Sequence, residues 1–219
     1  MNFVAIIYDL DGTLIDSERH WEEASRLFFA KRGVEQTPEL RRYMMGRSSW
    51  ESLAHLKKVY GWKEEVADAR AELLQMTDEI YRTKAAALPG ATTVLKATRK
   101  IFGGQAIASG SALQRIERVV DRLEWRNLFD HLISSEHVNH RGKPDPALFF
   151  YTAQQLGVNP SDCLVVEDSE NGVIAAKAAG MACIAVPERN AVGDFSQADL
   201  VVESLEDDRL LTYLRVGGN

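Results

Sequence analysis

The segment VAIIYDLDGT, residues 4–13, decides how the rest of the chain is interpreted. Its first five residues are apolar or aromatic, a run of the length expected for a buried parallel strand. By itself the following Asp-x-Asp-Gly is more often a turn or a calcium-type loop than a catalytic site. Its position directly after a buried strand instead favours chemistry at Asp9 and Asp11.

Short apolar segments alternate with amphipathic ones along most of the chain, which is typical of βαβ units and a parallel sheet. Ser111 and Gln114 form a capping box that predicts the start of one of the intervening helices. The expected fold class is therefore α/β, with a Rossmann-like parallel sheet flanked by helices. Its strands are predicted at residues 4–8, 105–108, 132–134, 164–166, 183–186 and 200–202.

Residues 17–87 interrupt this alternation with helical periodicity and no convincing strand. Leu53, Leu56 and Val59 share one helical face, which is expected to be packing. Leu88-Pro89-Gly90 suits a hinge at the end of the insertion. We therefore expect a small all-helical cap domain after the first strand. The predicted domains are an α/β core, residues 1–16 and 88–219, and the cap, residues 17–87.

The composition excludes some functions. The chain has 219 residues, 45% of them hydrophobic and 26% charged, and a formal net charge of −6. These values are ordinary for a soluble globular protein, and the apolar runs are too short to span a bilayer. No basic, apolar leader opens the sequence, so a cytoplasmic protein is expected. The negative charge disfavours a nucleic-acid surface.

Three predicted strands end in residues suited to phosphoryl transfer. Asp9 and Asp11 follow the first strand, Ser109 ends the second, and Glu167 and Asp168 end a later one. Ligands of open α/β sheets bind outside the carboxyl ends of the strands, so these residues are expected to converge. Close carboxylates repel each other, and a shared divalent cation would relieve the repulsion. Oxygen ligands from few carboxylates suit Mg²⁺.

A mechanism follows as a hypothesis. Asp9 attacks the phosphorus in line, while Mg²⁺ and Lys143 neutralise charge on the phosphoryl oxygens. Asp11 protonates the leaving alcohol and later accepts a proton from water. Ser109 and the backbone N–H groups of Gly110 and Ser111 hold the phosphoryl group at a helix N-terminus.

Four segments in this order resemble the motifs of the haloacid dehalogenase superfamily, most closely its β-phosphoglucomutase and sugar-phosphate phosphatase branch. They are DLDGTL at 9–14, Ser109, GKPDP at 142–146 and EDSENG at 167–172. The resemblance implies a Mg²⁺-dependent phosphatase that acts on a small phosphorylated metabolite, such as a sugar or polyol phosphate, through a phosphoaspartate. A monomer is the default for this branch. The implied roles are nucleophile for Asp9, acid/base for Asp11, phosphate ligands for Ser109 and Lys143, metal ligands for Asp9, Asp11 (by its carbonyl) and Asp168, and a supporting position behind the metal for Glu167.

Substrate specificity is expected to come from the cap. His20, Arg47 and Ser48 are its candidate contacts, because Arg47 and Ser48 lie in a helix-joining loop that could meet the active site. Trp21 fits the apolar face of its helix and is expected to be core.

A phosphosugar mutase is the nearest alternative, because it uses the same nucleophile. Such mutases carry a histidine where Trp21 stands and an arginine in the cap loop near Ser49. They also have lysine and asparagine where Ala112 and Leu113 stand. The missing groups would grip a bound sugar phosphate, so hydrolysis is favoured.

A receiver-like signalling module is a more distant alternative, because it also forms a phosphoaspartate at a strand end. The helical insertion at residues 17–87 and the acid Asp11, two positions after the nucleophile, argue for turnover instead.

Overall fold

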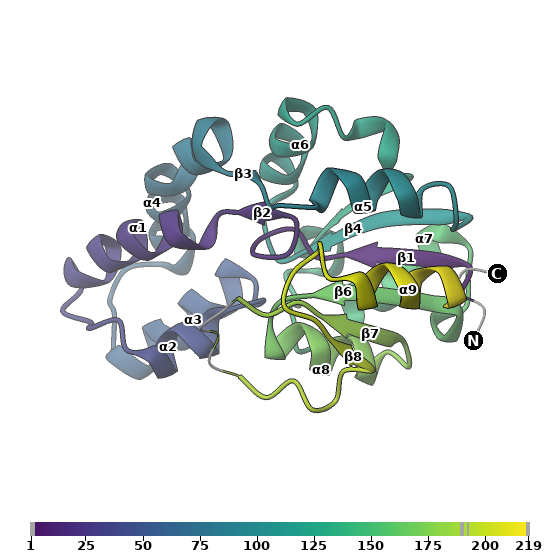
Figure 1. The fold of residues 1–219 in the computed structure, drawn as a ribbon. Coiled ribbons are helices and arrows are strands. Elements are labelled where there is room, and N and C mark those ends of the chain that lie inside the picture. Colours follow the sequence, from purple (N-terminus) through teal and green to yellow (C-terminus); the bar gives the residue numbers. More distant parts are fainter. Residues whose placement is uncertain (1–2, 189–190, 192, 218–219) are drawn as a thin grey trace.

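The computed structural model describes residues 3–188, 191 and 193–217. At its centre is a six-stranded parallel sheet with the strand order β5-β4-β1-β6-β7-β8 (Figure 1). The predicted α/β class is confirmed, and each predicted strand end lies within one residue of an observed one. The strands are β1 (Ala5–Tyr8), β4 (Gly104–Ser109), β5 (His131–Ser134), β6 (Cys163–Glu167), β7 (Ala182–Ala185) and β8 (Leu200–Val201).

Strand β1 lies between β4 and β6, and all of its residues are buried. Successive side chains of a strand point to opposite faces of the sheet, so β1 contributes to two cores. Ile6 and Tyr8 pack in the core under α5 (Ala91–Thr98), α6 (Leu113–Arg122) and α9 (Asp208–Gly217). Ala5 and Ile7 pack in the core under α7 and α8. These two helices span Ala147–Leu156 and Glu170–Ala178, and the short helical turns are η2 (Arg126–Leu128), η3 (Ser135–Val138) and η4 (Pro160–Asp162).

The inserted helices gather to one side of the sheet (Figure 1). They have a hydrophobic core of their own, which includes Phe28, Leu53, Leu56 and Leu73. Val59 is 58% exposed, so the packing prediction is wrong there, because the last turn of its helix projects past this core. The helices are α1 (Glu18–Ala30), α2 (Pro38–Met44), α3 (Ser49–Tyr60), α4 (Val66–Glu79) and the π-helical turn η1 (Ile80–Lys84).

The two chain crossings between sheet and cap run side by side as a short antiparallel pair, β2 (Ile15–Asp16) and β3 (Ala86–Ala87). The expectation that residues 17–87 contain no strand is therefore wrong at β3. A two-residue strand is too short to show a period, and it forms here because the crossings lie together. The domain limits at residues 17 and 87 stay a prediction.

No helix in the described ranges is long and apolar enough to cross a membrane.

Candidate active site

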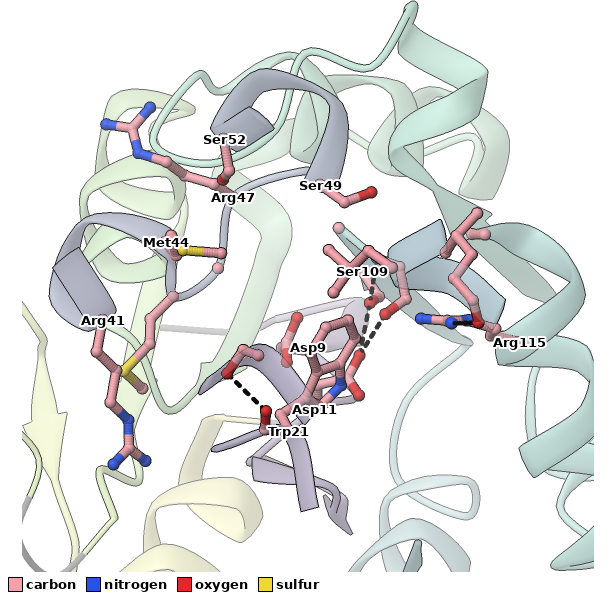
Figure 2. A pocket seen from close by; sticks show the side chains of 18 of the residues that line it. Asp9, Asp11, Trp21, Arg41, Met44, Arg47, Ser49, Ser52, Ser109 and Arg115 are labelled. Carbon is pink, nitrogen blue, oxygen red and sulfur yellow. Dashed lines mark hydrogen bonds between the residues drawn. The ribbon is translucent and has the colours of Figure 1, made fainter. Parts of the chain in front are cut away.

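The carboxyl ends of β1, β4 and β6 lie next to one another, because these strands are neighbours in the sheet. They bring Asp9, Asp11, Ser109 and Asp168 to one pocket, whose opposite wall comes from the cap (Figure 2). The predicted convergence of these residues is therefore found in the structure, as expected at the carboxyl edge of an open α/β sheet.

Lys143 joins this group from the loop that precedes α7. Its side chain is fully buried, and its Nζ donates to Asp9 Oδ1 at 2.5 Å and to Glu167 Oε1. Burial alone lowers the pKa of Lys143, but the charges of Asp9 and Glu167 more than offset this and raise the pKa above its usual value. Lys143 is therefore a cation fixed beside the proposed nucleophile.

Asp9 is 5% exposed and lies in a strongly acidic environment. Burial raises its pKa well above the usual value; Lys143 opposes this rise, and the charges of Glu167 and Asp11 add to it. Beside Asp9, one ammonium group thus faces several carboxylates.

Glu167 accepts from Lys143 and is itself held in place by hydrogen bonds. Its carboxylate is fully buried and accepts hydrogen bonds from the backbone N–H groups of Asp168 at 3.1 Å and Ser169 at 3.0 Å, and from Ser169 Oγ at 2.9 Å. Ser169 Oγ in turn accepts from Gly172 N at 3.0 Å and so caps α8. The supporting role behind a metal stays a prediction, whereas the contact with Lys143 is direct.

Asp11 is held by hydroxyl groups. Its Oδ1 accepts from Ser17 Oγ and Tyr81 OH, both at 2.8 Å. Its Oδ2 accepts from Ser111 Oγ at 2.7 Å and from Ser109 Oγ at 3.4 Å. Hydroxyl hydrogen bonds to a carboxylate orient it as well as satisfy it.

The capping box predicted at Ser111 is wrong. Helix α6 begins at Leu113, and its N-cap, Ala112, makes no side-chain hydrogen bond. Ser111 lies one residue too early to cap the helix, and its hydroxyl is bound to Asp11 instead. A local pattern was overridden by a tertiary contact.

The cap candidates differ in where they lie. Ser48 is buried, donates to His140 O at 2.7 Å and caps α3. Arg47 lies along the pocket, but its guanidinium points away from the two aspartates and stacks 4.3 Å from the Tyr43 ring centroid (Figure 2). His20 is half-buried in α1. Substrate contacts of His20, Arg47 and Ser48 stay predictions.

Cap residues other than the three predicted substrate contacts also line the pocket. Ser49 and Ser52, in the first turns of α3, do so, and so does Trp21. The expectation that Trp21 packs in the core is confirmed, and its Nε1 in addition donates to Tyr81 OH at 2.7 Å. The apolar stripe of its helix indicated this packing, because Trp21 contacts both hydrophobic cores. The stripe carries no signal that Trp21 also lines the pocket.

Tyr81 and Arg115 were missed altogether. Tyr81 is fully buried, and burial first, then the Asp11 charge, raise its pKa well above the usual value despite the opposing charge of Arg115. The Arg115 guanidinium lies 4.6 Å from the Tyr81 ring centroid and donates to Leu74 O at 2.6 Å. Neither residue belongs to a local motif, so the sequence offered no signal for them.

The predicted metal ligands fit a hard cation by their chemistry. Within the described part of the chain, no three His, Cys, Asp or Glu side chains are gathered as a metal cluster. The predicted set does not need one, since it takes two carboxylates, Asp9 and Asp168, and the main-chain carbonyl of Asp11. Asp168 is oriented by Thr13, whose Oγ1 donates to its Oδ1 at 3.1 Å.

Residues 3–180 match the family model of the haloacid dehalogenase-like hydrolases. Hexitol phosphatase B of Escherichia coli is 33% identical over 93% of this chain and 93% of its own length. The chain therefore belongs to the haloacid dehalogenase-like hydrolases, and its enzyme class is phosphoric monoester hydrolase. The resemblance seen in the sequence motifs is confirmed.

Two further similarities concern length and fold. The bifunctional riboflavin kinase/FMN phosphatase of Arabidopsis thaliana is 31% identical over 94% of this chain, and the match spans 54% of the plant protein. The crystal structure of β-phosphoglucomutase from Clostridium difficile superposes with a TM-score of 0.81 at 24% identity, covering 98% of this chain and 97% of that one. The second likeness concerns the fold alone.

Proposed function

We propose that this protein hydrolyses a small phosphorylated metabolite through a phosphoaspartate on Asp9, with Mg²⁺ as its cofactor. The observation that carries the proposal is the placement of Lys143 Nζ 2.5 Å from Asp9, beside the hydroxyl-bound carboxylate of Asp11. A nucleophile, a fixed cation and an oriented acid/base are the groups that such a reaction needs.

In the first step, an oxygen of Asp9 attacks the phosphorus, and the bond between phosphorus and the leaving oxygen breaks. Asp11 gives its proton to that oxygen, so the products are a free alcohol and the aspartyl phosphate. Lys143 and Ser109 hold the phosphoryl oxygens while charge develops on them.

In the second step, water attacks the phosphorus of the aspartyl phosphate. Asp11, now ionised, takes a proton from this water, and the acyl phosphate bond breaks to free the Asp9 carboxylate and inorganic phosphate. The cap wall of the pocket limits the entry of water before the first step is complete.

Asp9, Asp168 and the Asp11 carbonyl would hold Mg²⁺. When bound, the cation supplies positive charge that Lys143 alone does not provide for an acidic pocket that must also receive a phosphate.

For the substrate we propose a sugar or polyol phosphate. The pocket offers Gln36, Ser49 and Ser52 as hydrogen-bonding groups for hydroxyls, and Trp21 and Met44 as an apolar surface for a carbon chain. The names of two relatives support this class, because hexitol phosphates and FMN both carry their phosphate on a polyol chain.

Hydrolysis is favoured over a mutase reaction by the arginines of the cap. A mutase must grip a sugar that carries a second phosphate. The guanidinium of Arg47 is stacked on Tyr43, and Arg41 Nη2 lies 3.1 Å from Glu188 Oε2, so both are engaged outside the catalytic centre (Figure 2).

The test is a panel of hexose, pentose, polyol and nucleotide phosphates with Mg²⁺, in which released phosphate and isomerised product are both measured. We expect released phosphate in excess, with Asp9→Asn reducing it to background. Asp121→Asn, on the exposed side of α6, is the matched control and should retain activity. Isomerised product as the main outcome would establish a mutase, and full activity in Asp9→Asn would refute the nucleophile.

A further inference from the structure

Tyr81 and Trp21 form a hydrogen-bonded chain that ends on Asp11. Trp21 Nε1 donates to Tyr81 OH at 2.7 Å, and Tyr81 OH donates to Asp11 Oδ1 at 2.8 Å. The two rings meet edge to face, with centroids 6.3 Å apart, and Tyr81 is fully buried. The Tyr81 hydroxyl therefore accepts from Trp21 and donates to Asp11 Oδ1, which at 2.8 Å is nearer than Ser111 Oγ at 3.4 Å.

The two residues come from the two chain crossings. Trp21 lies in α1, shortly after β2, and Tyr81 lies in η1, shortly before β3. Ser109 and Ser111, which bind the other oxygen of Asp11, belong to the end of β4 and the loop after it. Residues of the sheet side thus bind Asp11 Oδ2, and residues next to the two crossings bind Asp11 Oδ1.

From this arrangement we infer that Tyr81 is a positioning residue for the acid/base Asp11, and that Trp21 orients Tyr81 for this task. The inference deepens the proposed function and rests on it. The hydrogen bond between Trp21 and Tyr81 joins the segments next to the two crossings, directly beside Asp11. The Asp11 carboxyl therefore keeps all of its hydrogen bonds only when the two crossings lie next to each other as they do here. Cap position and proton transfer are coupled through the Tyr81 hydroxyl, which binds the same Asp11 oxygen as the hydroxyl of Ser17 at the other crossing.

The chemical consequence concerns the leaving group. In the first step the proton of Asp11 moves to the leaving oxygen as the bond from phosphorus to that oxygen breaks. An alkoxide needs this proton, whereas 4-nitrophenolate leaves without it. A misplaced Asp11 should therefore slow the cleavage of an alkyl phosphate far more than that of an aryl phosphate of similar size.

The experiment compares benzyl phosphate with 4-nitrophenyl phosphate in wild type, Tyr81→Phe and Trp21→Phe. We expect Tyr81→Phe to lower kcat for benzyl phosphate about 10-fold or more, with KM little changed, and kcat for 4-nitrophenyl phosphate by less than about 2-fold, since a general acid contributes roughly 10²–10⁴ in rate. Trp21→Phe should act in the same direction with a smaller effect. Combining Tyr81→Phe with Asp11→Asn should add little to the loss caused by Asp11→Asn alone.

Tyr8→Phe is the matched control, because Tyr8 is also a fully buried tyrosine and its hydroxyl lies 3.0 Å from Thr98 Oγ1, within the core under α5. It should leave the ratio of the two rates unchanged. An equal loss on both esters in Tyr81→Phe would assign Tyr81 a merely structural role and overturn the inference, as would no loss on either. If the wild type hydrolyses neither ester, that result would instead count against the proposed function.

Discussion

Gly172 shows how one residue without a side chain keeps the site intact. A Cβ built there would lie 1.9 Å from Glu167 Cδ and 2.1 Å from Glu167 Oε1. Those atoms belong to the buried carboxylate that Lys143 contacts, and Lys143 in turn contacts Asp9. The helix α8 can therefore start under the active site only because position 172 leaves room for Glu167.

We predict that Gly172→Ala is destabilising and inactivating. Alanine is better than glycine in a helix by about 1 kcal/mol, but displacing a member of a buried ion pair costs about 3–5 kcal/mol. The net loss in the free energy of unfolding should be about 2–4 kcal/mol in urea denaturation, with loss of phosphatase activity. Gly103→Ala is the control, since its added Cβ would meet Val4 O at 3.5 Å, an ordinary contact. Wild-type stability in Gly172→Ala would contradict the packing of Glu167.

At the scale of elements, the end of α2 and the loop that joins it to α3 rest on the start of α8. Asn171 Nδ2 donates to Met45 O at 2.7 Å, and Arg42 Nε donates to Glu170 Oε2 at 2.6 Å. Gly46, in the left-handed region with φ 75°, comes so close that an added Cβ would lie 2.5 Å from Ser169 Oγ. The cap in this structure is therefore closed onto the core through backbone contact as well as exposed ion pairs, which contribute little by themselves.

Gly46→Ala should obstruct this closed arrangement. Ser169 Oγ cannot move aside freely, because it donates to Glu167 and accepts from Gly172. We expect kcat/KM to fall about 10-fold or more, given that a misplacement of about 1 Å can cost about 100-fold. Gly33→Ala separates strain from contact, because Gly33 also has a positive φ, 65°, but no atom within 4 Å of an added Cβ. Equal kinetic losses in the two variants would show that backbone strain, and not closure, is responsible.

At the scale of the whole molecule, the sheet gathers acidic side chains that no single segment contains. Asp9 and Asp11 come from the loop after β1, and Glu167 and Asp168 come from the end of β6, 156 to 159 positions later in the chain. These strands are adjacent, so the fold itself creates the excess of negative charge. A divalent cation would stabilise this arrangement in the native state and not in the unfolded chain.

Mg²⁺ should therefore raise the melting temperature of the protein. At a concentration about 100-fold above Kd, binding contributes about 2.7 kcal/mol, which corresponds to about 5–10 °C for a chain of this size. Treatment with a chelator should reverse the shift and abolish hydrolysis, and added Mg²⁺ should restore both. Asp168→Asn should lose most of the shift, while Asp121→Asn should keep it; an equal shift in both variants would place the cation elsewhere.

Much of the fold and the central site could be predicted because their signals are local. The apolar run before Asp9 and the alternation of segments indicate strands and helices by their periods, and strand ends in a parallel sheet must meet at one edge. Ser109, Lys143 and Asp168 could be joined to Asp9 on these grounds together with the family motifs.

The surroundings of Asp11 were decided by the tertiary structure. Ser111 has a pattern typical of a helix cap but binds Asp11, and Tyr81, 70 positions away, has no pattern that marks it. The same holds for the direction of Arg47, which depends on the ring of Tyr43. A period or a motif reports how a residue relates to its neighbours in the chain, whereas a hydroxyl or guanidinium finds its partner only after the crossings and the cap have packed.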